Sequence, residues 1–507
     1  MVACATDILG IKVMRKKDVL FLTMLVAVSF PVHAQTIYSL TDCRRMATQH
    51  NKALKMANEQ VEAAKHMEKA AMTQFLPSAS ATGAYLHNQK NISLMGQDAY
   101  LPVYSMAADG SPSFFNSVNN NWMYMNGMPV APLDEGGQPF NPTQNPEKIQ
   151  WKNMAYLPKD AFSLDMKNVH VGNIMITQPL FLGGKIIALN ELAKSTKQLA
   201  TAGLEGKLAQ TLLETDIAYW RIVSLVNKEK LAISYLELLQ KMAGDVEKSI
   251  AIGVATKADQ LTVKVKQNEA EMSLLQVQDG LKLSRMALNQ LCGLPLDAVS
   301  QLADETLQAI EEPLPMVEQS LSERSEIKSL EAGLNIADAN KRLMVSRFLP
   351  NAALTAGYLT TNPSLYNGIE PKFDGQFQVG VVVNVPLFHW GERVQTLRSA
   401  QHEKKALEYQ LEEAREKIEL DVMQSKFKLE GAAKKVVMTA SNKEKAQENL
   451  SSANLGYTSG VIAPSTVMEA QTAWLKACSE HIDAQIELQL SRVYLQKALG
   501  QLNAPNN

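Results

Sequence analysis

The chain has 507 residues, of which 46% are hydrophobic and 20% charged, and its formal net charge is −2. A balance this close to neutral does not favour nucleic-acid binding, which requires a basic face. Aromatic residues make up only 6%, and Ala, Leu, Gln, Lys and Glu recur, which favours long helices over a compact α/β enzyme.

The N-terminal residues have the pattern of a secretory signal peptide. Residues 15–17 are basic, residues 19–30 form an apolar stretch, and Ala34 ends a small-residue cleavage site before Gln35. Twelve apolar residues are too few for a membrane-spanning helix, which needs about 20. We therefore expect residues 1–34 to be a signal peptide, and our hypothesis for the true start is Met14.

Three cysteines follow the predicted cleavage site: Cys43, Cys292 and Cys478. They are odd in number, far apart in the sequence, and none is part of a C-x-x-C pair. This spacing favours buried free thiols over a disulfide framework or a metal site. We expect no metal and no cofactor.

The sequence contains an internal repeat. Residues 74–86 align with residues 347–359 at an offset of 273, and seven of the thirteen positions are identical. Residues 179–181 match residues 386–388 at an offset of 207, and glycines keep this offset in three pairs: Gly184 and Gly391, Gly253 and Gly460, Gly293 and Gly500. The two halves therefore share a layout, apart from an insertion of 66 residues between Leu86 and Pro179.

Each half is expected to run helix, strand, loop, strand, very long helix, tight turn and long helix. We expect an uninterrupted helix over 40–74, with Ser39 or Thr41 as its N-cap and Pro77 after its end. Residues 184–252 contain no proline, and 391–459 repeat that length. At 1.5 Å per residue each such helix would reach about 100 Å, so these helices should pack laterally against one another.

Four short segments have the character of strands. Residues 376–385 alternate between apolar and other residues, and residues 79–85 share their apolar phase with residues 352–358. Residues 168–180 alternate poorly, but they are expected to be the fourth strand. Strands of about ten residues with unlike faces are typical of a transmembrane barrel. Because four strands cannot close a barrel, we expect three chains to supply twelve.

The insertion lies within residues 87–170, which are rich in Pro, Asn, Gly and Met. It connects two strands at the end opposite the helices, so we expect it outside the cell. Two alternatives stay open: the insertion caps or plugs the barrel, or it is a flexible surface loop. Its Met and Trp content favours some packing.

Over about residues 36–502 the chain resembles the TolC family of outer-membrane efflux proteins. Residues 39–57 look like that family's first helix, with Asn51 and Leu54 at familiar places. The two P-L-F-x-x-G segments, 179–184 and 386–391, look like its strand-to-helix junctions, and so do the turns around Gly253 and Gly460. The resemblance implies a mixed, mainly α fold of two structural repeats, each with two strands plus long coiled-coil helices. It also implies a trimer that forms a 12-stranded outer-membrane β-barrel and a periplasmic α-helical tunnel.

The same resemblance implies an outer-membrane channel, the exit duct of a tripartite efflux or type I secretion system. The expected partners are a homotrimer, a periplasmic adaptor (membrane fusion protein), an inner-membrane pump and outer-membrane lipid. An enzyme is disfavoured because no Ser/His/Asp or H-E-x-x-H arrangement and no phosphate-binding glycine loop occurs in the sequence. The alternative is a periplasmic coiled-coil structural or adaptor protein without a barrel.

We divide the chain accordingly. After the signal peptide we expect a first TolC-like repeat over 35–293, which contains the long extracellular loop 87–170. A linker over 294–315 leads to a second repeat over 316–502, followed by a tail over 503–507.

The resemblance also implies a periplasmic gate at the helix tips. Asp259 matches an acidic gate position, Tyr457 matches a gate tyrosine, and Thr466 and Glu469 stand where the family often has two acids. Ile462 replaces an arginine that occurs in the family. Two plainer interpretations stay open: Asp259 and Glu469 are first-turn acids favoured by the helix dipole, and the tips are simple turns. The tip residues expected to contact an adaptor are Gly253, Val254, Ala255, Thr256, Gly460, Val461, Ile462 and Ala463.

Overall fold

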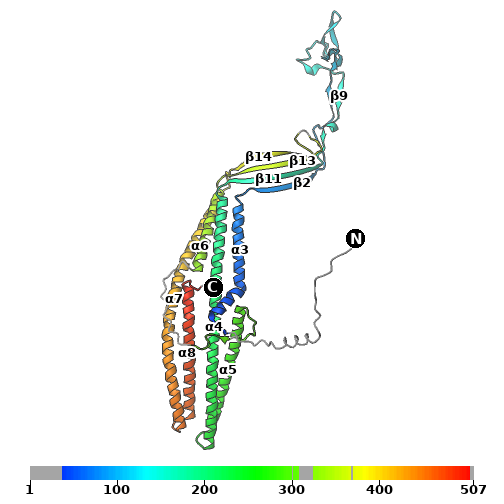
Figure 1. Cartoon of the computed structure of the whole chain (residues 1–507). Helices are drawn as coiled ribbons and strands as arrows, with labels where there is room; N and C mark the ends of the chain where they lie inside the picture. Colours follow the sequence, from blue (N-terminus) through cyan, green and yellow to red (C-terminus); the bar gives the residue numbers. More distant parts are fainter. Residues whose placement is uncertain (1–36, 300, 308–323, 367–368, 503–507) are drawn as a thin grey trace, which may run out of the picture. The chain divides into compact units, whose positions relative to one another are not determined.

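The computed structural model describes residues 37–299, 301–307, 324–366 and 369–502. The predicted signal peptide (1–34) and tail (503–507) lie outside the described residues, as does part of the predicted linker (294–315). The chain divides into two compact units (Figure 1). The helical unit comprises Met1–Ala71, Ile187–Arg342 and Val394–Asn507, and the sheet unit comprises Met72–Ile186 and Leu343–Arg393.

Long helices form most of the helical unit. The two longest, α4 and α7, have 67 residues each, as predicted, and at 1.5 Å per residue each extends about 100 Å. Each leads through a tight turn into a second helix. No helix among the described residues combines the length and the apolar character needed to cross a membrane. The helices are α2 (Leu40–His50), α3 (Lys52–Thr73), α4 (Lys185–Ala251), α5 (Lys257–Cys292), α6 (Ser325–Ser346), α7 (Glu392–Thr458) and α8 (Pro464–Ala498).

The prediction of an uninterrupted helix over 40–74 is wrong, because the helix is interrupted at Asn51, between α2 and α3. Asn51 has an extended backbone, with φ −60° and ψ 119°. Its side-chain oxygen accepts hydrogen bonds from the backbone N–H groups of Ala53 (2.8 Å) and Leu54 (3.2 Å), so it caps the new helix. Of the two predicted N-cap residues, Ser39 caps α2, and it forms a capping box with Asp42.

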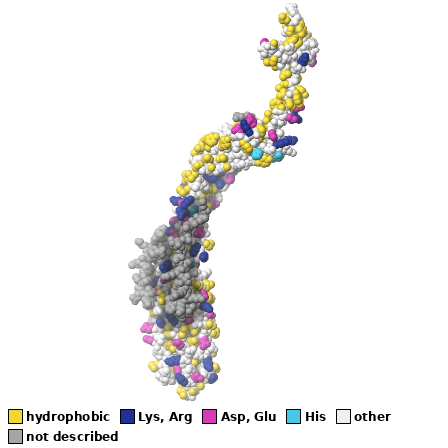
Figure 2. Space-filling view, turned by 45° about the vertical axis from the view of Figure 1, so that its right-hand side comes forward, with side chains coloured by type: hydrophobic (Ala, Val, Ile, Leu, Met, Phe, Trp, Pro, Cys, Tyr) yellow, Lys and Arg dark blue, Asp and Glu magenta, His cyan; other side chains and the backbone are white. Residues whose placement is uncertain are grey.

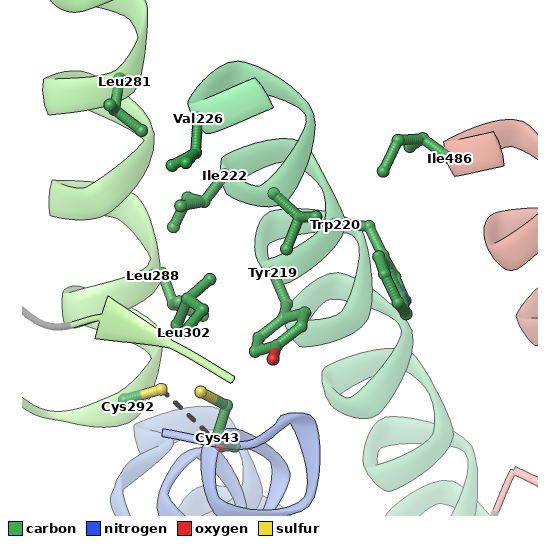
Figure 3. Close-up of a cluster of buried hydrophobic side chains, with 11 residues drawn as sticks. Cys43, Tyr219, Trp220, Ile222, Val226, Leu281, Leu288, Cys292, Leu302 and Ile486 are labelled. Carbon is green, nitrogen blue, oxygen red and sulfur yellow. Dashed lines mark hydrogen bonds between the residues drawn. The ribbon is translucent and has the colours of Figure 1, made fainter. Parts of the chain in front are cut away.

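The core of the helical unit lies where α2, α4 and α5 meet (Figure 3). Tyr219 and Ile222 of α4 are fully buried beside Leu288 of α5, and the Tyr219 hydroxyl donates to Asp304 at 2.7 Å. A short parallel pair, β1 (Ile37–Tyr38) with β12 (Gln301–Leu302), lies beside this core. Cys43, Cys292 and Cys478 are buried and are free thiols in this structure, as predicted.

A buried ion pair joins α2 to α4. Arg44 donates from Nε to Asp216 Oδ1 at 2.7 Å and from Nη2 to Oδ2 at 2.5 Å. The Asp216 side chain is fully buried, and the Arg44 side chain is 20% exposed. Burial raises the pKa of Asp216, and the guanidinium opposes that rise by stabilising the carboxylate. The pairing is bidentate, which is the geometry that best compensates for the lost hydration of the two charges.

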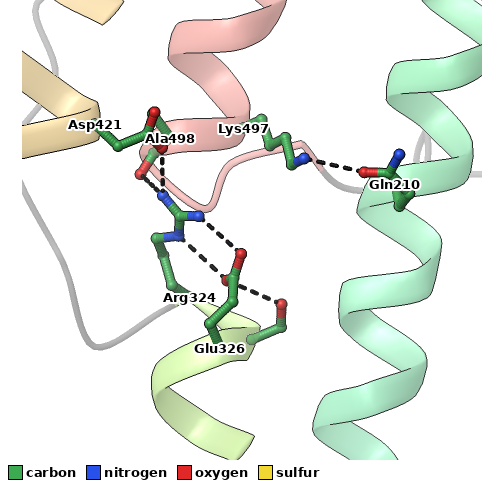
Figure 4. Close-up of polar contacts among 7 residues, drawn as sticks. Gln210, Arg324, Glu326, Asp421, Lys497 and Ala498 are labelled. Carbon is green, nitrogen blue, oxygen red and sulfur yellow. Dashed lines mark hydrogen bonds and ion pairs between the residues drawn. The ribbon is translucent and has the colours of Figure 1, made fainter. Parts of the chain in front are cut away.

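A second buried arginine, Arg324, connects α6 to both helices of the last hairpin (Figure 4). Its guanidinium donates to Glu326 at 2.8 Å, to Asp421 of α7 at 3.0 Å, and to the carbonyl oxygen of Ala498 at the end of α8, also at 3.0 Å. The start of α6 is thereby fixed against the helices that follow it in the sequence.

The sheet unit contains one four-stranded antiparallel sheet in the order β14-β13-β11-β2. All four predicted strands are present: β2 (Ser78–His87), β11 (Asn168–Leu182), β13 (Asn351–Asn362) and β14 (Asp374–Asn384). The poorly alternating segment is the longest of them, with 15 residues and a register shift between Pro179 and Phe181. Within the described residues, β2 and β14 are edge strands with one partner each.

The two faces of this sheet differ in chemistry. Directly opposite residues of neighbouring strands share a face, so the register fixes which side chains lie together. Hydrophobic side chains gather over the sheet in the space-filling view (Figure 2). One face carries Phe377, Val379, Val381 and Val383 of β14, Tyr358 and Leu354 of β13, and Ile174 and Ile176 of β11. The opposite face carries Gln376, Gln378, Thr355, Asn173, Thr177, Ser80 and Thr82, among fewer apolar residues.

The insertion between β2 and β11 is folded into paired strands. Its aromatic side chains cluster, with the ring of Trp151 edge-on to Tyr104 at 4.9 Å and to Phe114 at 5.5 Å. The Asn120 amide donates to the carbonyl oxygens of Leu133 and Lys148. The pairs are β3 (Ile92–Ser93) with β10 (Ser163–Leu164), β4 (Ala99–Pro102) with β9 (Met154–Leu157), β5 (Ser105–Met106) with β6 (Pro112–Ser113), and β7 (Trp122–Met125) with β8 (Met128–Pro132). Three 3₁₀ turns join them: Phe115–Ser117, Pro146–Lys148 and Lys159–Phe162.

The Arg44–Asp216 pair predicts a large stability difference between two neighbouring arginines. Replacing Arg44 with Met leaves a buried carboxylate unpaired, so Arg44→Met should lower the free energy of unfolding by about 3–5 kcal/mol. Arg45 pairs with Asp42 at the surface, with both side chains more than a third exposed, so the control Arg45→Met should cost less than about 1 kcal/mol.

Chemical unfolding in detergent, followed by helical circular dichroism, measures both variants. Without Arg44 the folded pKa of Asp216 rises further above its unfolded value, so stability is lost as pH rises through that folded pKa. The Arg44→Met defect should therefore be larger at about pH 8 than at about pH 5. Equal losses in the two variants would contradict the role given to the buried pair.

Candidate functional site

The two helix hairpins end in turns of the same geometry. Gly253 and Gly460 both have left-handed backbones, with φ of 77° and 74°. Val254 donates its N–H to the carbonyl of Ser249 at 2.9 Å, and Val461 donates to Gly456 at 2.9 Å. With the bonds from Gly253 to Ile250 and from Gly460 to Tyr457, these complete a Schellman motif at each tip. The glycines are needed because side chains are strained at such φ values.

At the first tip, Asp259 is part of the capping box that starts α5, with Thr256 as the N-cap. Its carboxylate accepts hydrogen bonds from the hydroxyl of Thr256 at 2.7 Å and from the N–H of Thr256 at 2.8 Å, and the Thr256 hydroxyl in turn caps the N–H of Asp259. These bonds lower the pKa of Asp259, first through the hydroxyl and then through the backbone N–H. The side chain is therefore a carboxylate held in a fixed orientation at the start of α5.

The second tip is built differently. Ala463 precedes α8 and has no side chain that can cap it, and Pro464 opens the helix. Thr466 and Glu469 lie in the first turns of α8, and both are exposed. Only the first tip thus commits its acidic residue to a capping box.

Tyr457 connects the two hairpins. Its hydroxyl lies 3.3 Å from the Ser249 hydroxyl of α4, and its ring packs on a core to which all four hairpin helices contribute. Met242 and Val246 come from α4, Val263 from α5, Leu450 and Ala453 from α7, and Val467, Met468 and Ala470 from α8. The tips of the two hairpins are therefore joined within each chain.

Ile462 contacts the same core. It lies over Gly456, where an added Cβ would overlap the isoleucine Cδ1. This contact was not predicted from the sequence. A glycine one turn before the tip is its only sequence signal, since Schellman turns often place an apolar residue over the preceding turn.

The predicted gate and adaptor residues thus lie on two turns, but they have different surroundings. Tyr457 and Ile462 are half-buried, whereas Val254 is 73% and Val461 is 81% exposed. Within the described part of the chain, no group of three or more His, Cys, Asp or Glu side chains is placed to hold a metal ion.

Comparison with known proteins bears on the sequence and on the fold. Residues 316–501 match the family model described as outer membrane efflux protein. The cobalt-zinc-cadmium resistance protein CzcC of Cupriavidus metallidurans is 27% identical over 168 residues, which are 31% of this chain. The chain spans about 40% of the length of this curated relative.

Solved outer-membrane proteins share the fold over nearly the whole chain. The outer-membrane protein VceC of Vibrio cholerae gives a TM-score of 0.66 at 16% identity, covering 91% of this chain and 96% of its own. The outer-membrane channel OprN gives a TM-score of 0.68 at 16% identity, covering 91% and 89%. These findings confirm the resemblance predicted from the sequence. The fold of the chain is that of solved outer-membrane channel proteins, and its residues 316–501 match the outer membrane efflux protein family model.

Proposed function

We propose that this chain is the outer-membrane exit duct of a tripartite efflux or type I secretion system. Three copies form a 12-stranded barrel in the outer membrane and an α-helical tunnel that extends into the periplasm. Substrates pass through from the periplasm or from an inner-membrane pump, and they are not chemically altered. The family match and the outer-membrane location of the structural neighbours support this proposal.

The observation that carries the proposal is the sheet with one apolar face and two open edges. Edge strands expose unpaired N–H and C=O groups, and in hydrocarbon every such group needs a partner. Pairing β14 of one chain with β2 of the next satisfies both edges when three chains close a ring. The apolar face, with Phe377 and Val379, then meets lipid, and the face with Gln376 and Gln378 meets the lumen.

The helical unit supports the same assembly. Single chains rarely expose extended apolar surface, yet α7 exposes Phe427 (78%) and Val437 (71%), and α5 exposes Met272 (62%) and Leu283 (66%). Neighbouring copies that pack their helices side by side would cover these residues. The alternative, a periplasmic coiled-coil or adaptor protein without a barrel, gives no role to the apolar face of the sheet.

The proposed organisation follows the sequence repeat. Residues 1–34 direct export, residues 35–293 and 316–502 form the two repeats, and 294–315 link them. The order α3, β2, β11, α4, α5 has its counterpart in α6, β13, β14, α7, α8. The insertion, within 87–170, stands on the extracellular side.

The hairpin tips form the periplasmic mouth. Three copies each of Asp259 and Glu469 would make a negative ring that attracts cations, with Tyr457 and Thr466 beside it. The exposed tip residues, with Val254 and Val461 foremost, would dock a periplasmic adaptor that connects the duct to its pump.

Epitope accessibility tests the proposed orientation. A short epitope inserted after Gly110, an exposed turn residue of the insertion, should bind antibody on intact cells. The matched epitope after Gly460 should bind only once the outer membrane is permeabilised, because that turn faces the periplasm.

Both tagged proteins must first be found in the outer-membrane fraction. If the Gly110 epitope stays inaccessible on intact cells, the proposed topology is wrong and the adaptor alternative gains support.

Charge removal at the tips tests the gate. Asp259→Asn combined with Glu469→Gln should move the cation-to-anion permeability ratio in planar bilayers towards that of a neutral pore. The amide that replaces the Asp259 carboxylate keeps an oxygen that can accept from Thr256, so the cap is largely preserved. Glu419→Gln removes an exposed acid of α7 about 60 Å from the tip and should leave the ratio unchanged. An unaltered ratio in the double variant would mean that the two acids serve only their helices.

A further inference from the structure

Two of the three cysteines meet in the helical unit although 249 positions separate them in the sequence. Cys43 lies in the first turn of α2, and Cys292 is the last residue of α5. Each is 1% exposed, and the Cys292 thiol lies 3.7 Å from the carbonyl oxygen of Cys43. Figure 3 shows the two sulfur atoms pointing toward one another.

The surrounding elements hold the two residues in this position. Tyr38, which precedes Cys43 in the chain, pairs with Leu302, which follows Cys292. This β1–β12 pair therefore holds the segments that flank the two cysteines beside each other. On the other side, Gly293 lies so close to His50 that an added Cβ would come within 2.5 Å of the imidazole. The thiols are therefore not brought together by a mobile surface segment.

The two thiols also affect each other's pKa. A hydrogen bond between them raises the pKa of Cys43, and burial raises it further, whereas the same bond lowers the pKa of Cys292. Cys478, in α8, is buried without a neighbouring thiol in the described residues, and burial raises its pKa.

We propose that Cys43 and Cys292 form a disulfide in the exported protein, which ties α2 to the end of α5. This inference rests on the proposed function, because only an exported chain reaches a compartment where disulfides persist. The thiolate of one cysteine attacks a disulfide-bearing oxidoreductase, and the thiol of the other then displaces that enzyme from the mixed disulfide. One S–S bond forms, and the two thiols give up two protons and two electrons to the oxidant, which becomes a dithiol.

Oxidation must precede the final docking of α2, since both sulfur atoms are inaccessible once the core closes. The bond then closes a loop of about 250 residues, which includes β2, the insertion, β11, α4 and α5. Cross-links over long loops restrict the unfolded chain most strongly. The start of the mature chain thereby stays attached to the first hairpin even when the β1–β12 pair opens.

Thiol counting on the full-length protein tests the proposal. Cells are quenched in acid, and the denatured protein is labelled with a maleimide that shifts its gel mobility, with and without prior reduction. The mature wild-type chain should take one label unreduced, on Cys478, and three after reduction. Peptide mass mapping should find the Cys43 and Cys292 peptides joined, lighter than the two separate thiol peptides by two hydrogen atoms.

Two variants serve as matched controls. Cys478→Ser should take no label unreduced and two after reduction, and Cys43→Ser should take two under both conditions. Three labels on unreduced wild-type protein would overturn the disulfide, wherever the protein fractionates. Fractionation of the same cells tests the duct separately. Three free thiols in outer-membrane protein would contradict only the disulfide, whereas absence of the protein from the outer membrane would contradict the proposed function.

Discussion

Backbone hydrogen bonding at the two edges of the four-stranded sheet governs the proposed assembly. β13 and β11 are paired on both sides, but β2 and β14 each leave one side open. An apolar face that includes Phe377 and Ile174 suits hydrocarbon, where an unpaired N–H or C=O group costs several kcal/mol. A single chain cannot meet both demands, so in our account assembly is part of folding. In the proposed trimer, the number of chains that closes the barrel would also set the number of helices around the tunnel.

The helical unit also contains surface that one chain does not bury by itself. Helices of 67 residues cannot be enclosed in one globular core, so their side chains are buried partly within the chain and partly, in our account, by neighbours. Polar pairs with defined geometry, Arg44 with Asp216 and Arg324 with Asp421, fix which helix lies against which. At the tips the two hairpins share one small core with Tyr457 and Ile462 at its edge, so the two turns are packed as one unit.

Much of this could be predicted from sequence, because the features that matter are periodic or local. Proline-free stretches indicated the long helices, and glycines at a fixed offset indicated both tips. The break at Asn51 could not be predicted, because one side chain that accepts two backbone N–H groups outweighs a good helical pattern. Alternation was weak in β11 because Val171 and Met175 fall on the more polar face, whereas His170 and Gln178 fall on the apolar one. The contacts of Ile462 with Gly456 and of Cys43 with Cys292 depend on packing that no spacing rule contains.

Electron microscopy of the protein extracted from outer membranes in mild detergent tests whether three chains close the barrel. The proposed duct requires three chains in a ring, with β14 of each chain paired to β2 of the next, and a helical tube that extends about 100 Å from the barrel. Density in which β2 and β14 of one chain pair with each other, or a detergent-free monomer or dimer without a barrel, would contradict it. In either case the apolar face of the sheet would need another partner, and a periplasmic coiled-coil protein would become the better explanation.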